Sequence, residues 1–142
     1  AKPEAKVTTP ITSAIKALKK LNIKNLSIFT PYTKEINDSV VNYFEKENIT
    51  VKSLTYYDIA SDIDIGKVDQ KNLFRVLSKI DLSKSDALFV SCTALPVLSI
   101  IDELEKKLNK IVLSSNQTLI WDSLNQIGYK ENIEGFGKLF NS

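Results

Sequence analysis

Histidine is absent from this 142-residue chain, and cysteine occurs only once, at position 92. The absence of histidine excludes Ser-His-Asp triads, histidine-based zinc sites and a histidine general base within the chain. A single cysteine excludes an internal disulfide and is typical of the reducing cytoplasm, where we expect the protein to work. Methionine is also absent and the chain opens on alanine, which predicts that Ala1 is not the first residue of the translated gene.

Glycine and long apolar runs are scarce as well. The chain has four glycines, three of them in its last fifteen residues, so no glycine-rich loop exists to hold a nucleotide phosphate. No apolar run approaches the roughly 20 residues of a membrane-spanning helix. The net charge is only +2, which gives no electrostatic reason to expect nucleic acid or a membrane surface as partner.

What is present is a regular alternation of amphipathic segments and short apolar runs. The runs are rich in β-branched and aromatic residues, as in parallel strands that are covered on both faces. We predict strands at residues 26–29, 49–56, 87–90 and 111–113, and helices near 11–21, 33–44, 69–80, 96–108 and 114–127. The expected fold is one α/β domain, an open and mostly parallel four-stranded sheet of the flavodoxin-like or Rossmann-like kind, with helices on both faces.

Capping residues and apolar spacing refine these helices. Thr33 and Asp69 are expected N-caps, and Ser114 with Gln117 has the spacing of a capping box. Pro96 suits the first turn of a helix that follows the third strand directly. The predicted apolar stripe of the second helix contains Ile36, Val40, Val41 and Phe44. The predicted stripe of the last helix contains Ile120, Trp121, Leu124 and Ile127, and Gly128 ends this helix.

Ser91, Cys92 and Thr93 follow the third strand, on the edge of the sheet where α/β proteins bind ligands. If a helix starts directly after Cys92, free backbone N–H groups and the positive helix end favour a thiolate or hold a substrate carboxylate. The alternative is a buried cysteine that serves as a small hydrophobic residue. The flanking hydroxyls favour the functional interpretation, because they suit a purely apolar core poorly.

Tyr32 follows the first strand at the same predicted edge. Its hydroxyl could donate a hydrogen bond to a ligand oxygen, and the alternative is an ordinary surface tyrosine in a turn. Asp58, Asp62 and Asp64 lie in an irregular stretch that lacks the glycine and terminal glutamate of a calcium loop. A solvated acidic loop is the simpler interpretation of these three carboxylates.

Five short motifs, in order along nearly the whole chain, resemble one family. They are Thr8-Thr9-Pro10 with Ala14 and Ala17-Leu18; Thr30-Pro31-Tyr32; Ser91-Cys92-Thr93; Ser114-Ser115-Asn116-Gln117 with Trp121; and Gly135-Phe136-Gly137-Lys138-Leu139-Phe140. Together they resemble the carboxy-terminal half of the maleate cis-trans isomerases. The broader group is the aspartate/glutamate racemase superfamily, which also contains the arylmalonate decarboxylases.

The resemblance implies an enzyme without a cofactor that has two similar α/β domains and a site in the cleft between them. It implies that Cys92 is the catalytic cysteine of the second domain and that Tyr32 contacts the substrate. We expect Ser91, Thr93 and Asp62 to be substrate-binding residues as well. The small carboxylate substrate of the isomerases is maleate: one thiolate adds to its alkene carbon, the central bond rotates, and elimination yields fumarate. An asparagine of the family falls at Asp62 here, and a carboxylate is a poorer partner for a dianion.

The resemblance also implies that residues 1–142 are the second domain with the last helix and tail, and that the first domain is absent from this chain. An apolar docking surface left open would favour self-association, so we expect a homo-oligomer. Three alternatives stay open at this point. They are an amino-acid racemase, a decarboxylase that needs only one cysteine as proton donor, and a non-catalytic carboxylate-binding module.

Overall fold

The computed structural model describes residues 4–129 and 131–142 and has one sheet at its centre. Its four strands are β1 (Asn25–Thr30), β2 (Thr50–Tyr56), β3 (Ala87–Val90) and β4 (Ile111–Ser114). They run parallel in the order β2-β1-β3-β4, so β1 and β3 are central and β2 is an edge strand. The predicted α/β class and parallel four-stranded sheet are confirmed.

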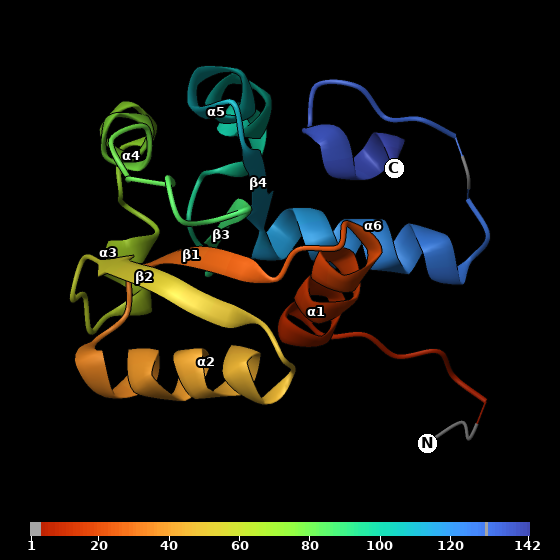
Figure 1. Cartoon of the computed structure of the whole chain (residues 1–142), viewed down its shortest axis with the longest axis horizontal. Helices are drawn as coiled ribbons and strands as arrows, with labels where there is room; N and C mark the ends of the chain where they lie inside the picture. Colours follow the sequence, from red (N-terminus) through yellow and green to blue (C-terminus); the bar gives the residue numbers. More distant parts are fainter. Residues whose placement is uncertain (1–3, 130) are drawn as a thin grey trace.

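Helices cover both faces of the sheet (Figure 1). They are α1 (Pro10–Lys20), α2 (Lys34–Lys46), α3 (Asp62–Ile65), α4 (Gln70–Leu77), α5 (Ile101–Leu108) and α6 (Ser115–Gln126). One core lies between the sheet and α1 with α2, and contains Leu18, Phe44 and Phe89. The other core lies under α3, α4 and α5, and contains Phe29 and Leu73. Among the described residues, no helix is long and apolar enough to cross a membrane.

The predicted caps are correct where the local sequence decides them. Asp69 accepts a hydrogen bond from the N–H of Asn72 at 2.8 Å, and Ser114 and Gln117 form the full capping box of α6. Thr33 occupies the N-cap of α2, but its side chain makes no capping hydrogen bond. Gly128 follows α6 with a φ of +80°, a conformation that glycine adopts without strain.

The prediction of a helix directly after Cys92 is wrong. Residues 91–97 form an irregular loop, a short 3-10 turn follows at Leu98–Ile100, and α5 begins only at Ile101. Two reasons are visible in the loop. The residue before a proline avoids the helical region, which applies to Leu95 before Pro96. In addition, Leu95 and Val97 are both buried in the core, and a loop can point both of them inward.

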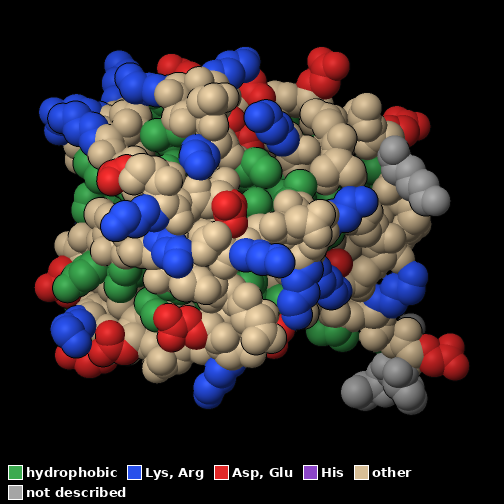
Figure 2. Space-filling view, viewed as in Figure 1, with side chains coloured by type: hydrophobic (Ala, Val, Ile, Leu, Met, Phe, Trp, Pro, Cys, Tyr) green, Lys and Arg blue, Asp and Glu red, His purple; other side chains and the backbone are tan. Residues whose placement is uncertain are grey.

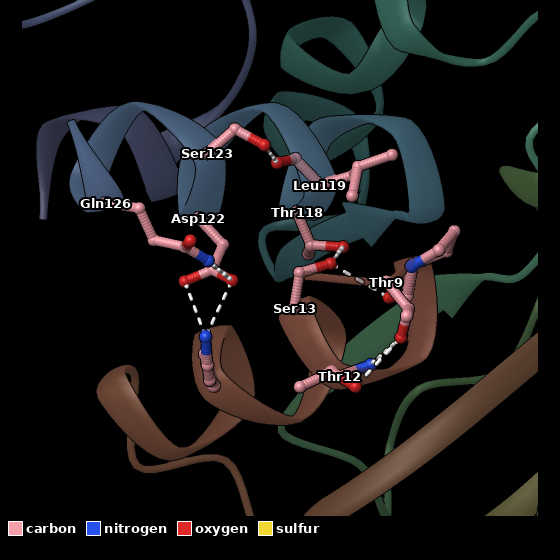
Figure 3. A network of polar contacts seen from close by, with 10 residues as sticks. Thr9, Thr12, Ser13, Thr118, Leu119, Asp122, Ser123 and Gln126 are labelled. Atoms are coloured by element: carbon pink, nitrogen blue, oxygen red, sulfur yellow. Dashed lines mark hydrogen bonds and ion pairs between the residues drawn. The ribbon is translucent and has the colours of Figure 1, made fainter. Parts of the chain in front are cut away.

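The predicted apolar stripe of α6 is wrong at Ile120 and Ile127, because much of the buried side of this helix is polar, whereas Trp121 packs against the core as expected. Ile120 and Ile127 are 42% and 78% exposed, whereas Thr118 and Asp122 are buried against α1. Figure 3 shows the side chains of Thr118 and Asp122 pointing toward α1. Lys16 Nζ lies 2.8 Å from Asp122 Oδ2, and Ser13 donates to Thr118 at 3.3 Å. Burial opposes ionisation of Asp122, but the hydrogen bonds with Lys16 and its other neighbours prevail and lower the pKa of its carboxyl.

The buried carboxylate of Glu105 bonds both the carboxy-terminal tail, at Lys138, and strand β4, at Val112. Glu105 of α5 is 4% exposed and accepts the backbone N–H groups of Val112 at 3.0 Å and Lys138 at 2.9 Å. Gly137 lies beside it with a φ of +85°, and a Cβ there would stand 2.6 Å from Ile101. A close approach of the tail to α5 therefore requires glycine at this position.

We expect Glu105→Ala to lower the free energy of unfolding by at least about 1–3 kcal/mol, because the buried N–H of Val112 and the part-buried N–H of Lys138 lose their acceptor. Urea unfolding measures the loss. Glu103→Ala removes an exposed carboxylate from the same helix and is the matched control. Equal stability of the two variants would show that Glu105 does not hold the tail.

Burial raises the pKa of Glu105 against the opposing effect of its two N–H donors. The pKa of Glu105 is higher in the folded state than in the unfolded state, so its protonated form stabilises the fold. This contribution is complete at pH values below the unfolded-state pKa and is lost as the pH rises through the folded-state pKa. The stability advantage of wild type over Glu105→Gln should therefore be largest at acid pH. A stability difference between wild type and Glu105→Gln that grows with rising pH would contradict this prediction.

Candidate functional site

The loop after β1 and the loop after β3 meet at the carboxyl edge of the sheet, as expected for neighbouring parallel strands. Tyr32 lies in the first loop, and Ser91, Cys92 and Thr93 lie in the second. Tyr32 packs against the core cluster that contains Cys92, and both Cys92 and Ser91 are close enough to influence the pKa of its hydroxyl. The structure thus brings together residues that are about 60 positions apart in the sequence.

Cys92 is 5% exposed and packs in the core cluster beneath α4 and α5. The backbone N–H of Ala94 donates to its Sγ at 3.3 Å. Tyr32 is a further polar neighbour of the sulfur, close enough for the two groups to influence each other electrostatically. No helix N-terminus lies at Cys92, because α5 begins nine residues further along the chain.

The Tyr32 phenol remains protonated at neutral pH. Partial burial is the largest cause of its raised pKa, and the neighbouring Cys92 raises it further, while a hydrogen bond with Ser91 lowers it. The negative charge of Asp62 also raises this pKa, so that Asp62 acts electrostatically on the same centre. A neutral phenol is a hydrogen-bond donor, which suits a carboxylate or a developing oxyanion.

An open groove of about 460 Å³ adjoins this centre. Tyr32, Ser91 and Thr93 line it, whereas Cys92 lies behind the wall. Its other walls come mainly from α1 and α2 and include Ile11, Ile36, Val40 and Tyr43. Ile36, which the sequence pattern assigned to the buried stripe of α2, is 50% exposed and faces this groove instead. No charged side chain is among the described residues that line it.

Two asparagines that the sequence reasoning did not assign hold the site loops in place. Asn37 of α2 is fully buried and donates to the carbonyl of Tyr32 at 3.1 Å. Asn116 of α6 donates to the carbonyl of Thr93 at 2.9 Å. The one sequence signal for Asn37 was its position inside the apolar stripe of α2. A buried side-chain amide there must find hydrogen-bond partners, which points to a role in holding neighbouring loops.

Asp62 begins α3 and is exposed, as are Asp58 and Asp64. Asp64 pairs with Lys67 at 3.0 Å, whereas Asp62 has no ion pair among residues 4–129 and 131–142. In that same part of the chain, no group of three His, Cys, Asp or Glu side chains could hold a metal ion.

Comparison with known proteins gives consistent matches over nearly the whole chain. The family model of arylmalonate decarboxylase matches residues 3–140. Maleate isomerase of Alcaligenes faecalis is 24% identical over 139 residues, which cover 97% of this chain and 55% of that protein. Arylmalonate decarboxylase of Bordetella bronchiseptica is 24% identical over 137 residues, which cover 94% of this chain and 57% of that protein.

Solved structures of the same two kinds share the fold. A Nocardia farcinica maleate cis-trans isomerase mutant with a covalently bound succinylcysteine intermediate superposes with a TM-score of 0.92 at 22% identity, covering 98% of this chain and 57% of that one. A crystal structure of arylmalonate decarboxylase gives a TM-score of 0.80 at 24% identity, covering 95% and 59%. The chain therefore spans little more than half the length of these relatives.

Proposed function

Because the chain belongs to the arylmalonate decarboxylase family, we propose that it is the second domain of a cofactor-independent isomerase that acts on a small dicarboxylic acid. The observation that supports this most is the proximity of Tyr32 and Cys92 beside an open groove at the carboxyl edge of the sheet. The relatives of this chain include maleate isomerases, and one of their structures contains a succinylcysteine. Maleate-like substrates are accordingly our first candidates.

In the proposed reaction a cysteine sulfur forms a bond to one alkene carbon of maleate. The π electrons move toward the adjacent carboxylate, which leaves a single bond that can rotate. Breaking the sulfur–carbon bond returns the electron pair to the double bond and gives fumarate. Cys92 would act either as this nucleophile or as the thiol that handles the proton, and the first domain would supply the other group.

Tyr32, Ser91 and Thr93 are the proposed substrate-binding residues on this domain. The neutral Tyr32 hydroxyl would donate to a substrate carboxylate oxygen as charge develops on it. Asp62 would face the same substrate, where its negative charge disfavours a dianion. This charge is the reason to test substrates with fewer negative charges, or with an ammonium group, beside maleate.

A decarboxylase is the second candidate, and the match of the family model to residues 3–140 favours it. That reaction needs one thiol as proton donor, and this chain has one cysteine. The test is to assay the longest protein that contains this chain with maleate, aspartate and an arylmalonate. Fumarate formation from maleate supports the isomerase, and carbon dioxide release from the arylmalonate supports the decarboxylase. Failure with all three would overturn the proposed function.

We expect Tyr32→Phe to lower kcat/KM by about 10²-fold, the usual cost of losing one donor to a developing oxyanion. Its thermal midpoint should change little, because the ring that packs against the core is retained. Tyr56→Phe, at a strand end outside the groove, is the matched control. An unchanged kcat/KM would remove Tyr32 from the site.

A further inference from the structure

A second hollow, of about 540 Å³, lies toward the amino ends of β1 and β3, away from the loops that carry Tyr32 and Cys92. Its walls come from β1, β2, the end of α4 and the segment that leads into β3. Figure 1 shows β2 at the edge of the sheet and α4 on one of its faces, the two elements that contribute much of this lining. We call it the β2 groove, and none of its lining residues also lines the groove at Tyr32.

The floor of the β2 groove is a chain of three serine hydroxyls. Ser27 Oγ lies 2.7 Å from Ser53 Oγ and 2.8 Å from Ser85 Oγ. Ser27 is fully buried and Ser85 is 3% exposed, on a face of the sheet where parallel strands normally present apolar side chains. Polar residues in such a place conflict with the local packing pattern, and such conflicts concentrate at functional sites.

The three serine hydroxyls of this floor have one more hydrogen than the number of hydrogen bonds between them. Three hydroxyls carry three hydrogens, and the two contacts between them use two. The hydrogen bonds of residues 4–129 and 131–142 include no acceptor for the third. One serine O–H is therefore free to donate to a group in the groove.

The rim of the β2 groove is basic. It carries Lys52, Lys79 and Lys84, all exposed, and none of them has an ion pair within the described part of the chain. The one acidic side chain of the lining, Asp81, already accepts the N–H of Ser83 at 2.9 Å. Figure 2 shows basic side chains, with fewer acidic ones, over the α4 and β2 side of this face.

We propose that the β2 groove binds a small oxyanion with at least two negative charges, of the phosphate or dicarboxylate type. Serine O–H and lysine ammonium groups donate hydrogen bonds, and oxyanion oxygens only accept them. The three ammonium groups repel cations and attract an anion. The site stands apart from the proposed chemistry at Cys92 and does not depend on it.

The test is a pair of nuclear magnetic resonance titrations of the protein, one with inorganic phosphate and one with succinate, at constant ionic strength. We expect saturable shifts of the backbone amides of Ser53, Ser83 and Ser85. Lys52→Gln/Lys79→Gln/Lys84→Gln should raise the dissociation constant by about tenfold or more, because a charge-assisted hydrogen bond contributes about 1.5–3 kcal/mol. Ser53→Ala should weaken binding less.

The matched control is Lys20→Gln/Lys46→Gln/Lys71→Gln, which removes the same charge from exposed lysines outside the groove. It should leave the dissociation constant nearly unchanged, and dispersed amide spectra verify that each variant is folded. The two probes separate phosphate from dicarboxylate selectivity. Absence of saturation with both probes, equal weakening by the two triple variants, or shifts confined to Tyr32 and Ser91 would each overturn the proposal.

Discussion

Replacement of Cys92 by alanine should reduce turnover of the whole enzyme by at least about 10²- to 10⁴-fold, the range for loss of a positioned proton-transfer group. The sulfur lies within reach of the Tyr32 hydroxyl and the Ala94 N–H, so its loss removes the one thiol at this edge of the sheet. Stability should fall by only about 1 kcal/mol, because the change removes a single buried heavy atom. Steady-state kinetics and urea unfolding of the same preparations separate the two effects.

Cys92→Ser is the control for shape, since it keeps a small polar side chain. It should be nearly as inactive as Cys92→Ala if sulfur chemistry is required. Because Cys92 is the only cysteine, iodoacetamide incorporation into this chain reports on this residue alone. Labelling of the intact enzyme should be slowed by a bound substrate. Substantial activity of the alanine variant would place the chemistry elsewhere.

The second large effect is that residues 1–142 by themselves should show no measurable turnover. The proposed mechanism needs groups on opposite sides of the substrate, and this chain offers one cysteine and no histidine. The groove beside Tyr32 is open, so a bound carboxylate would stay exposed to water on its far side. Water weakens the electrostatic stabilisation of a developing carbanion or enediolate.

The measurement is to purify the 142-residue chain and a longer protein that includes the proposed first domain, and to assay both with the three candidate substrates. Circular dichroism of the short chain checks that it is folded. Light scattering checks whether it self-associates, as expected if an apolar surface is left open. Turnover by the short chain near the rate of the longer protein would mean that one domain suffices, either alone or as a dimer.

Local sequence signals determined much of the fold. Asp69 and the Ser114–Gln117 pair identify helix starts because a cap is a contact between residues three apart. The four short apolar runs identified the parallel sheet, and the family resemblance was confirmed by the comparisons. The meeting of Tyr32 with Cys92 also follows from the pattern, because β1 and β3 are adjacent.

The features that sequence reasoning missed depend on contacts between distant segments. Ile120 and Ile127 fit a helical stripe, but α6 turns Thr118 and Asp122 inward because Ser13 and Lys16 of α1 receive them. A periodicity count treats a polar residue as outward-facing and so selects the wrong side of this helix. The irregular loop after Cys92 is of the same kind, because burial of Leu95 and Val97 depends on the core around them.

The pairing of α1 with α6 has a consequence for biosynthesis. Ser13 meets Thr118 across 105 residues, so α1 leaves the ribosome well before the helix against which it packs. At about 5–20 residues per second, translation of the intervening segment takes about 5–20 s. During that interval the apolar side of α1, with Ala14 and Leu18, can dock only on an unfinished sheet. A nascent chain stalled before α6 should thus be the species that chaperones and proteases engage most readily.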